Sequence, residues 1–328
     1  MLGRREAVAA IASSLLAPAV VNGAGPSTGE KYPSRPVRIL VGFPPGASTD
    51  SIARIAADIL SRRLNGPVVV VNQAGAGGNV AAQAARTSDP DGYTFLMAIA
   101  SHVTNRALYK NLPYDPVRAF TPVSLIARIP FVLVAHRSFA ANTIRESLEM
   151  AKRRPGELNY ATSGLGSSQH LAMEQFADLT GAKLTHVAYR GGIPALTAVA
   201  ANEVPLALLT TTTVMPMLQN GSIKAIAIAS KQRSKLLPDL PTFRESGSPD
   251  FTADTWFGLL APRGTPPAIV DRIHSELTAG LQAPAVLERF QSMDARLINA
   301  GPVDFGNVMR QDDVTWSQIV REAGIQLD

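Results

Sequence analysis

The stretch that decides the fold runs from Val37 to Leu60 and reads VRILVGFPPGASTDSIARIAADIL. Its first five residues are mostly apolar and β-branched, which predicts a buried strand at 37–41. A loop rich in Pro, Gly and hydroxyl residues follows. Apolar side chains then recur at helical spacing from Ile52 onward, preceded by polar residues that can cap a helix. A strand, a loop and a helix in this order form the basic unit of a parallel α/β sheet.

The same unit recurs in two successive series along the chain. The first series has further strand-like runs at 68–71 and 94–99 and a short helical segment at 79–86. The second begins near Ile126 and alternates helices with strand-like runs at 131–134, 158–161, 184–188, 204–209 and 223–229. Past Thr242 the pattern changes to an apolar run at 256–260 and helices at 268–281 and 285–293, where the chain can return to complete the first series.

These series predict an α/β fold of two lobes, each a mainly parallel sheet flanked by helices. We expect lobe 1 to be discontinuous and lobe 2 to be continuous, with boundaries at 35–126 plus 255–328 for lobe 1 and at 127–254 for lobe 2. A chain of 328 residues with 46% hydrophobic and 17% charged residues is long enough and apolar enough for two cores.

The charge and cysteine content exclude several classes of protein. The formal net charge of +5 comes from basic residues that are spread along the chain without clusters, so we expect no nucleic-acid partner. Cysteine is absent, which excludes a lipidated N-terminal cysteine and any cysteine-based metal site or nucleophile. The absence of cysteine says nothing about the redox compartment, because domains of this size fold without disulfides.

Residues 1–24 have the pattern of a secretory signal peptide. Arg4 and Arg5 form a basic start, and an apolar, small-residue run from Ala7 to Val21 follows. The run is too short for a comfortable membrane span, and small residues at 17–19 or 21–23 offer a cleavage site. We therefore expect an exported, periplasmic protein that is soluble after signal-peptide removal, the alternative being an ordinary N-terminal helix.

The loop between the first strand and its helix is the first candidate ligand site. In a parallel α/β sheet such loops line the crevice, and the N–H groups of a helix N-terminus carry a partial positive charge that stabilises a carboxylate. The alternative is a plain turn with a helix cap. The candidate ligand-binding residues here are Phe43, Gly46, Ala47, Ser48, Thr49 and Asp50.

A second junction, from Thr162 to His170, is also rich in donors. Two glycines allow the backbone to approach a ligand, and several hydroxyls can bind it, although Ser167 or Ser168 can also act as a simple helix cap. The run from Thr210 to Thr213 can add hydroxyl donors or can be a β-branched strand end. The candidates from these two segments are Ser163, Gly164, Gly166, Ser167, His170 and Thr210.

The sequence offers little for catalysis or cofactors. The glycine-rich segment 75–79 departs from both the dinucleotide and the P-loop patterns, which favours close backbone packing or a crevice-lining turn. No Gly-x-Ser-x-Gly elbow occurs, and the five histidines include no pair at metal-ligand spacing. We therefore expect no enzyme, no catalytic residue, no cofactor and no metal, and a hydrolase that uses a serine with His170 is a distant alternative.

Taken in order, several segments resemble the periplasmic receptors of tripartite tricarboxylate transporters, often called Bug-type receptors. The resemblance covers nearly the whole chain after the first 24 residues. Each piece is weak alone, but their order and spacing are specific. The matching segments are Phe43 to Asp50, Ala53-Arg54, Asn72 to Asn79, Pro90 to Thr94, Leu112 to Pro116, Pro155-Gly156, Ser163 to Leu171, Leu237 to Thr242 and Trp256 to Pro262.

This resemblance implies a Venus-flytrap periplasmic binding protein, expected as a monomer, whose lobes close on a small carboxylate. The ligand would be a di- or tricarboxylate or an aromatic acid, delivered to an integral-membrane permease of a tripartite transporter. A ligand-sensing receptor that signals to a membrane partner is the alternative. The resemblance also implies that the two loops above hold the carboxylate and that Ser101 and His102 contact the crevice.

Two departures from the family pattern bear on the ligand. Ala47 stands where a second glycine is usual. The segment from Val204 to Pro216 often carries an aspartate in relatives, and here Leu209 and four threonines occupy that neighbourhood. Because an ammonium group would want a carboxylate there, we expect the far end of the ligand to be uncharged or anionic rather than that of an amino acid.

Overall fold

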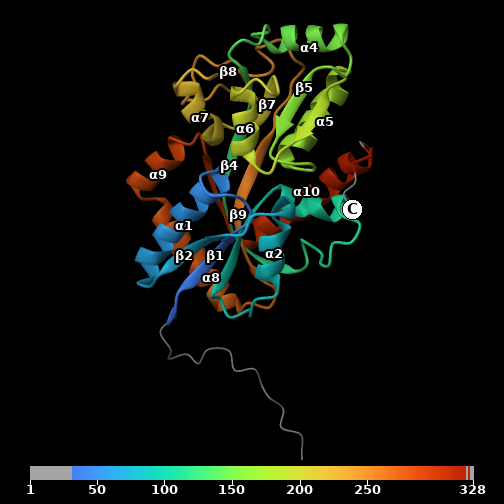
Figure 1. Ribbon diagram of the computed structural model, residues 1–328. Coiled ribbons are helices and arrows are strands. Elements are labelled where there is room, and N and C mark those ends of the chain that lie inside the picture. The colour runs from blue at the N-terminus through green and yellow to red at the C-terminus, as the bar shows by residue number, and fades with distance from the viewer. Residues whose placement is uncertain (1–31, 323, 326–328) are drawn as a thin grey trace, which may run out of the picture. The chain divides into compact units, whose positions relative to one another are not determined.

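The computed structural model describes residues 32–322 and 324–325, so the expected signal peptide at 1–24 lies outside the described residues. Strands and helices alternate as the sequence predicts (Figure 1). The strands are β1 (Val37–Val41), β2 (Val68–Asn72), β3 (Thr94–Ile99), β4 (Phe120–His136), β5 (Asn159–Thr162), β6 (Thr185–Ala188), β7 (Leu206–Thr210), β8 (Ile223–Ile228), β9 (Asp254–Pro262) and β10 (Arg296–Ala300). The helices are α1 (Ser48–Leu64), α2 (Asn79–Arg86), α3 (Ser101–Leu108), α4 (Ile144–Arg153), α5 (Ser168–Thr180), α6 (Gly192–Ala200), α7 (Thr211–Gln219), α8 (Pro267–Leu281), α9 (Pro284–Gln291) and α10 (Pro302–Glu322), with one 3₁₀ turn at Ala76–Gly78.

In lobe 1, β2, β1 and β3 run parallel, and β9 lies antiparallel between β3 and β4. Both faces of this sheet are covered. Helices α1 and α8 bury one face in a core that includes Ile52, Ile55 and Ile273. Helices α2, α3 and α10 bury the other face, where Val103 and Phe305 are fully enclosed. This two-sided burial explains why the strands read as continuous apolar runs.

Lobe 2 has the same layered construction. Strands β6, β5 and β7 run parallel, and β4 pairs antiparallel with β7 and β8. One core, with Ile144 of α4 and Phe176 of α5, covers one face. A second core, with Leu196 of α6 and Val214 of α7, covers the other. The loops between strands and helices of the two lobes are thereby carried by separately packed sheets.

The expectation of mainly parallel sheets needs a correction, because the sheet is mixed. Among the described residues, four strand pairings are parallel and five are antiparallel. The cause is β4, which is 17 residues long where the apolar run predicted only 131–134. Its first part pairs with β9 and its last part, from Phe131, pairs with β7, so one strand belongs to both sheets. The lobe boundaries proposed above fall within or beside these shared strands and stay a prediction.

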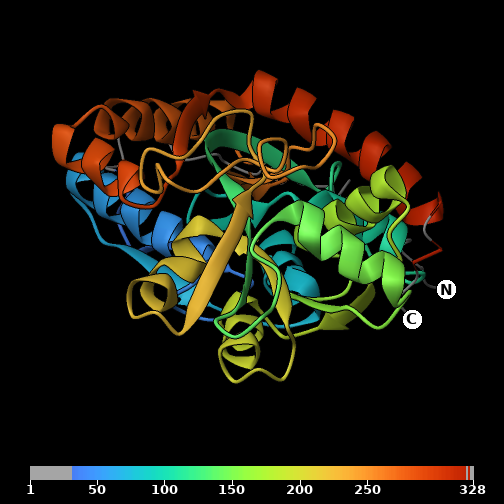
Figure 2. The ribbon, with the colours of Figure 1, turned by 90° about the horizontal axis from the view of Figure 1, so that it is seen from above.

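The C-terminal helix α10 lies mainly on lobe 1, and its far end contacts lobe 2. Trp256 of β9 donates its indole N–H to Asp312 of α10 at 2.6 Å. Val320, near the helix end, packs with Leu108 of α3 and with Leu171 of α5 in lobe 2. Figure 2 shows α10 running along one side of the sheet, on the same side as the long segment between β8 and β9. Within the described ranges, no helix has both the length and the apolar character needed to cross a bilayer.

Gly258 of β9 makes the close approach of α10 possible. A Cβ atom at this position would lie 2.2 Å from Cζ of Phe305. Because the ring is fully buried, it has no open space to move into. We expect Gly258→Ala to lower the free energy of unfolding by about 1–3 kcal/mol, the usual cost of overpacking, measured by urea denaturation.

Gly306, one residue after Phe305, supplies the control. A Cβ there would meet only a flexible arginine end at 3.3 Å and Pro122 at 3.5 Å, so Gly306→Ala should change stability by less than about 1 kcal/mol. Equal losses from the two variants would contradict the overpacking explanation.

Candidate functional site

A small cavity lies where the lobes meet. Lobe 1 contributes Phe43, Pro44, Ala47, Ser48, Thr49 and Ile99, together with Thr255 and Phe257 of β9. Lobe 2 contributes Ser163, Gln169, Gly191, Gly192, Ile193, Pro194, Thr210 and Thr213.

Three hydroxyls join the lobes across this cavity. Ser48 of α1 and Thr210 of β7 share a hydrogen bond of 2.5 Å, and Thr210 and Thr213 share another of 2.9 Å. All three residues are at least 95% buried. Because the first bond links residues 162 positions apart on opposite lobes, the structure shows a closed cleft.

Three helices begin at the cavity without a side-chain cap. These are α1 after Ala47, α6 after Gly191 and α7 after Thr210. The first N–H groups of a helix have no partner within the helix, and the helix dipole places a partial positive charge there. None of the residues that line the cavity carries an ionisable side chain. The described part of the site is therefore neutral in formal charge and electropositive through its backbone.

Asp50 positions the first loop and does not line the cavity. Its carboxylate accepts hydrogen bonds from the Gly46 N–H at 3.1 Å, Arg54 Nε at 2.8 Å and Asn72 Nδ2 at 3.0 Å. Burial favours the protonated carboxyl, but the bonds from Arg54, Gly46 and Asn72 outweigh it and hold the pKa of Asp50 below its ordinary value. Asn72 also donates to the Phe43 carbonyl at 3.1 Å. The hydrogen bonds of Asp50 and Asn72 therefore fix the conformation of the first loop.

The second loop turns mostly away from the cavity. Ser163 lines it and donates to Gln169 Oε1 at 2.9 Å. Ser167 is the cap of α5, and its hydroxyl accepts the His170 N–H at 3.3 Å. His170 Nδ1 accepts the Gly166 N–H at 3.0 Å. The polar side chains that predicted a ligand site here are therefore mostly hydrogen-bonded to other groups of the same loop and of the start of α5.

Ser101 and His102 lie in α3 and not in a loop, and they line a separate small cavity behind Phe43. His102 is 5% exposed, and its Nε2 bonds to the Pro116 carbonyl at 3.0 Å. Burial lowers the pKa of His102 to about 4, so the ring is neutral at neutral pH. Its packing against Tyr114 and Phe120 indicates a structural histidine.

The structure therefore brings together only part of the predicted set at the cavity. The residues that line it are Phe43, Ala47, Ser48, Thr49, Ser163 and Thr210. Those outside its lining are Gly46, Asp50, Ser101, His102, Gly164, Gly166, Ser167 and His170. Whether any of them contacts a ligand stays a prediction.

Sequence reasoning missed several lining residues. Gly191 and Gly192 lie at the start of α6, in the short junction that follows β6. This glycine-rich strand-to-helix junction is the same kind of sequence signal as the two loops that were predicted. Thr255 and Phe257 gave no signal, because β9 returns from the far end of the chain. Of the two alternatives for the 75–79 segment, close backbone packing or a crevice-lining turn, the structure shows close packing, since a Cβ on Gly42 would lie 2.5 Å from the Gly78 Cα.

The described lining of this cavity offers no serine–histidine pair for nucleophilic catalysis. No group of three or more His, Cys, Asp or Glu among them is arranged to hold a metal ion. Ser48 and Ser163 bond to Thr210 and Gln169, and no serine of the described cavity lining is hydrogen-bonded to a histidine. A nucleophile there would lack the adjacent base that activates it.

Two stacked histidine rings are hydrogen-bonded to the second loop. The rings of His170 and His186 lie 3.7 Å apart and nearly parallel, and His186 Nε2 bonds to Thr162 Oγ1 at 2.7 Å. Burial, reinforced by the neighbouring His170, lowers the pKa of His186 to about 3. His186 thus stays neutral in the folded protein under conditions in which an unfolded chain would protonate it.

His186 makes stability depend on pH. Between the unfolded pKa, about 6.5, and the folded pKa, about 3, the unfolded state binds more protons at His186, so its contribution to stability falls as pH falls. We expect the free energy of unfolding to drop more steeply from pH 7 to pH 5 in the unaltered protein than in His186→Gln. Urea denaturation across this range measures both, and parallel profiles would contradict the assignment.

Comparison with known proteins agrees with this architecture. A model of the "Tripartite tricarboxylate transporter family receptor" family, TctC, matches residues 52–325. Protein BugT of Bordetella pertussis is 35% identical over 306 residues, which cover 93% of this chain and 94% of BugT. The solved periplasmic binding protein BugD is 33% identical, with a TM-score of 0.84, over 90% of this chain and all of BugD.

A third relative was solved with a ligand. Rpa4515 of R. palustris, with adipate, is 34% identical and superposes with a TM-score of 0.86 over 90% of this chain and all of that one. The family model spans most of the chain, and BugD, a periplasmic binding protein, superposes on nearly all of it. The chain belongs to the TctC family of tripartite tricarboxylate transporter receptors and has the two-lobed fold of periplasmic binding proteins.

Proposed function

We propose that this protein captures a small carboxylate between its lobes in the periplasm and delivers it to the integral-membrane permease of a tripartite transporter. One observation carries the proposal: three uncapped helix N-termini meet at a cavity whose described lining has no ionisable side chain. A carboxylate there supplies the missing helix caps and neutralises the positive helix ends. A cation would find no counter-charge among these residues.

The residues favour a ligand with one or two carboxylates and no ammonium group. Burying an ammonium requires a paired carboxylate, and none lines the described part of the cavity. The apolar side chains of Phe43, Ile99 and Phe257 suit a short hydrocarbon segment between the ends. The adipate bound to Rpa4515 has this chemistry and makes dicarboxylates the first choice for a test.

A receptor that senses the same ligand and signals to a membrane partner would use the same capture site. No contact in the site favours sensing, and the family model describes transporter receptors. Transport is therefore the function proposed.

The direct experiment is thermal unfolding of the mature protein with mono-, di- and tricarboxylates, aromatic acids and amino acids. A ligand at about a hundred times its dissociation constant stabilises a protein by roughly 2.7 kcal/mol, which raises the midpoint by a few degrees. We expect shifts with dicarboxylates and none with aspartate or glutamate. Shifts confined to amino acids would contradict the proposed ligand class. Release of an unchanged ligand on denaturation, seen by mass spectrometry, would exclude turnover.

Thr210 tests the hydroxyl cluster. Thr210→Val keeps the side-chain shape and removes the hydroxyl that faces Ser48 and Thr213. It removes no helix cap, because the Thr210 side chain caps nothing. We expect dicarboxylate affinity to fall about tenfold, as for a lost hydrogen bond of roughly 1.4 kcal/mol, measured by calorimetry.

Thr197→Val on α6 of lobe 2 is the matched control. The exposed Thr197 hydroxyl donates to the Ile193 carbonyl of its own helix at 3.0 Å, bonds to nothing in the described part of lobe 1 and does not line the cavity. The affinity of this variant for dicarboxylates should stay within about twofold of that of the unaltered protein. Equal losses in the two variants would show that Thr210 acts through the packing of lobe 2 and not through the site.

A further inference from the structure

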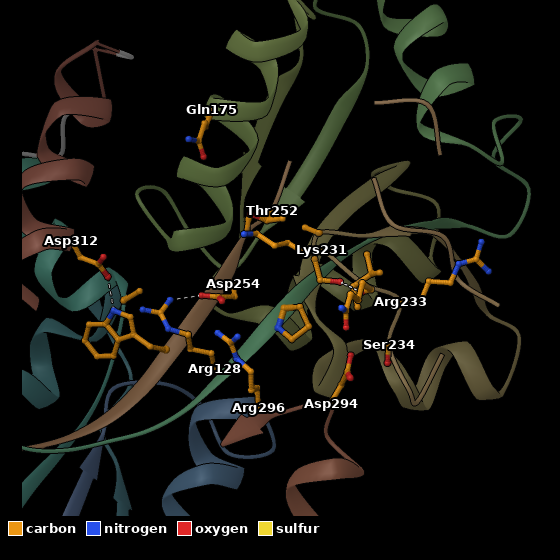
Figure 3. A pocket seen from close by; sticks show the side chains of 18 of the residues that line it. Arg128, Gln175, Lys231, Arg233, Ser234, Thr252, Asp254, Asp294, Arg296 and Asp312 are labelled. Carbon is orange, nitrogen blue, oxygen red and sulfur yellow. Dashed lines mark hydrogen bonds and ion pairs between the residues drawn. The ribbon is translucent and has the colours of Figure 1, made fainter. Parts of the chain in front are cut away.

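A second, larger cavity lies on the other face of β9, at the place where the chain crosses between the lobes (Figure 3). Residues of β4, β9, β10 and α10 form one side of it. Gln175 of α5 and the segment between β8 and β9 form the other side, which belongs to lobe 2. We call it the hinge cavity.

The cavity where the lobes meet holds the proposed ligand site, and we call it the substrate cavity. The hinge cavity and the substrate cavity are on opposite sides of one strand. Thr255 and Phe257 of β9 line the substrate cavity, whereas Asp254 and Trp256 line the hinge cavity. Successive side chains of a strand point to opposite faces, so this alternation fixes the geometry. A rotation of the lobes about the crossing strands that narrows one cavity must widen the other.

Two interactions fix the side of the hinge cavity that β4, β9 and α10 form. Arg128 of β4 and Asp254 of β9 form an ion pair of 2.6 Å that ties the two crossing strands together. The Trp256 indole donates to Asp312, and the ring packs edge-on against Phe305, which fixes α10 to the same strands. A larger side chain on α10 would therefore displace the lobe 2 side of the hinge cavity and not the helix.

We propose that the hinge cavity sets the substrate affinity from outside the substrate site, because volume that occupies it favours the closed cleft. The proposal rests on the proposed function, since it concerns closure around the captured acid. The structure combines the two expected features in one conformation: the Ser48–Thr210 bond closes the cleft, and the hinge cavity stands open. Opening the cleft would have to fill the hinge cavity, so an occupant disfavours the open state and shifts the population toward the closed one.

Two exposed residues on opposite walls allow a test without touching the substrate site. Thr315 of α10 and Thr252 of the lobe 2 segment both line the hinge cavity and are solvent-exposed, so Thr315→Trp and Thr252→Trp add bulk there with little disturbance of a core. Each should bind adipate, or whichever panel acid binds the unaltered protein, roughly three- to tenfold more tightly by calorimetry. Val314→Trp is the control, because Val314 is 65% exposed on the same helix and lies outside the cavity lining.

A second measurement needs no ligand. The chain has no cysteine, so Arg62→Cys on α1 and Gln219→Cys on α7 place one spin label on each lobe. In ligand-free protein, Thr315→Trp and Thr252→Trp should shift the label-to-label distances toward those expected from the closed cleft of the structure, while Val314→Trp leaves them unchanged. Distances that are the same in all variants, or tryptophan variants that bind no more tightly than Val314→Trp, would overturn the proposal. If no acid binds the unaltered protein, the proposed function fails, and the ligand-free distances still decide the role of the hinge cavity.

Discussion

The antiparallel pairing of β4 with β9 is the constraint on which the rest of the structure depends. These strands pair from Phe120 opposite Pro262 to Pro130 opposite Asp254, and β4 then continues into the sheet of lobe 2. Each lobe is otherwise a separately packed unit with its own cores. The crossing strands therefore determine where the lobes face one another, and the two sides of β9 become the walls of two different cavities.

The cavity between the lobes offers positive charge and hydrogen-bond donors to a carboxylate without any ionised side chain in its described lining. Burying a carboxylate is costly unless hydrogen bonds and positive charge replace its water. Here the starts of α1, α6 and α7 supply both through the backbone, and hydroxyls from both lobes complete the surface. The Asp50 carboxylate does not line the cavity and accepts hydrogen bonds from Arg54, Gly46 and Asn72. A carboxylate that serves the loop therefore does not repel the proposed ligand.

The two predicted loops differ in how their hydroxyl groups are used. Ser48 and Thr49 follow the start of α1, which has no side-chain cap, and both line the cavity, where the Ser48 hydroxyl bonds to Thr210 of the other lobe. Ser167 and His170 occupy a similar junction, but their side chains satisfy backbone N–H groups of the same loop. A hydroxyl before a helix serves a cap or a ligand equally well. The sequence cannot distinguish the two, because the choice depends on which way the loop turns in the folded lobe.

The sequence by itself determined the strand–loop–helix units, the two-lobe plan and the resemblance that identified the family, because these depend on spacing and composition within short stretches. Only the tertiary structure decided that β4 serves both sheets, that α10 reaches from lobe 1 to Leu171 of lobe 2, and that Gly191-Gly192 opens a third helix at the cavity. It also decided that Thr255 and Phe257 face the substrate cavity while Trp256 faces the hinge. These features arise from contacts between residues far apart in the chain, and no local pattern encodes which distant surfaces meet.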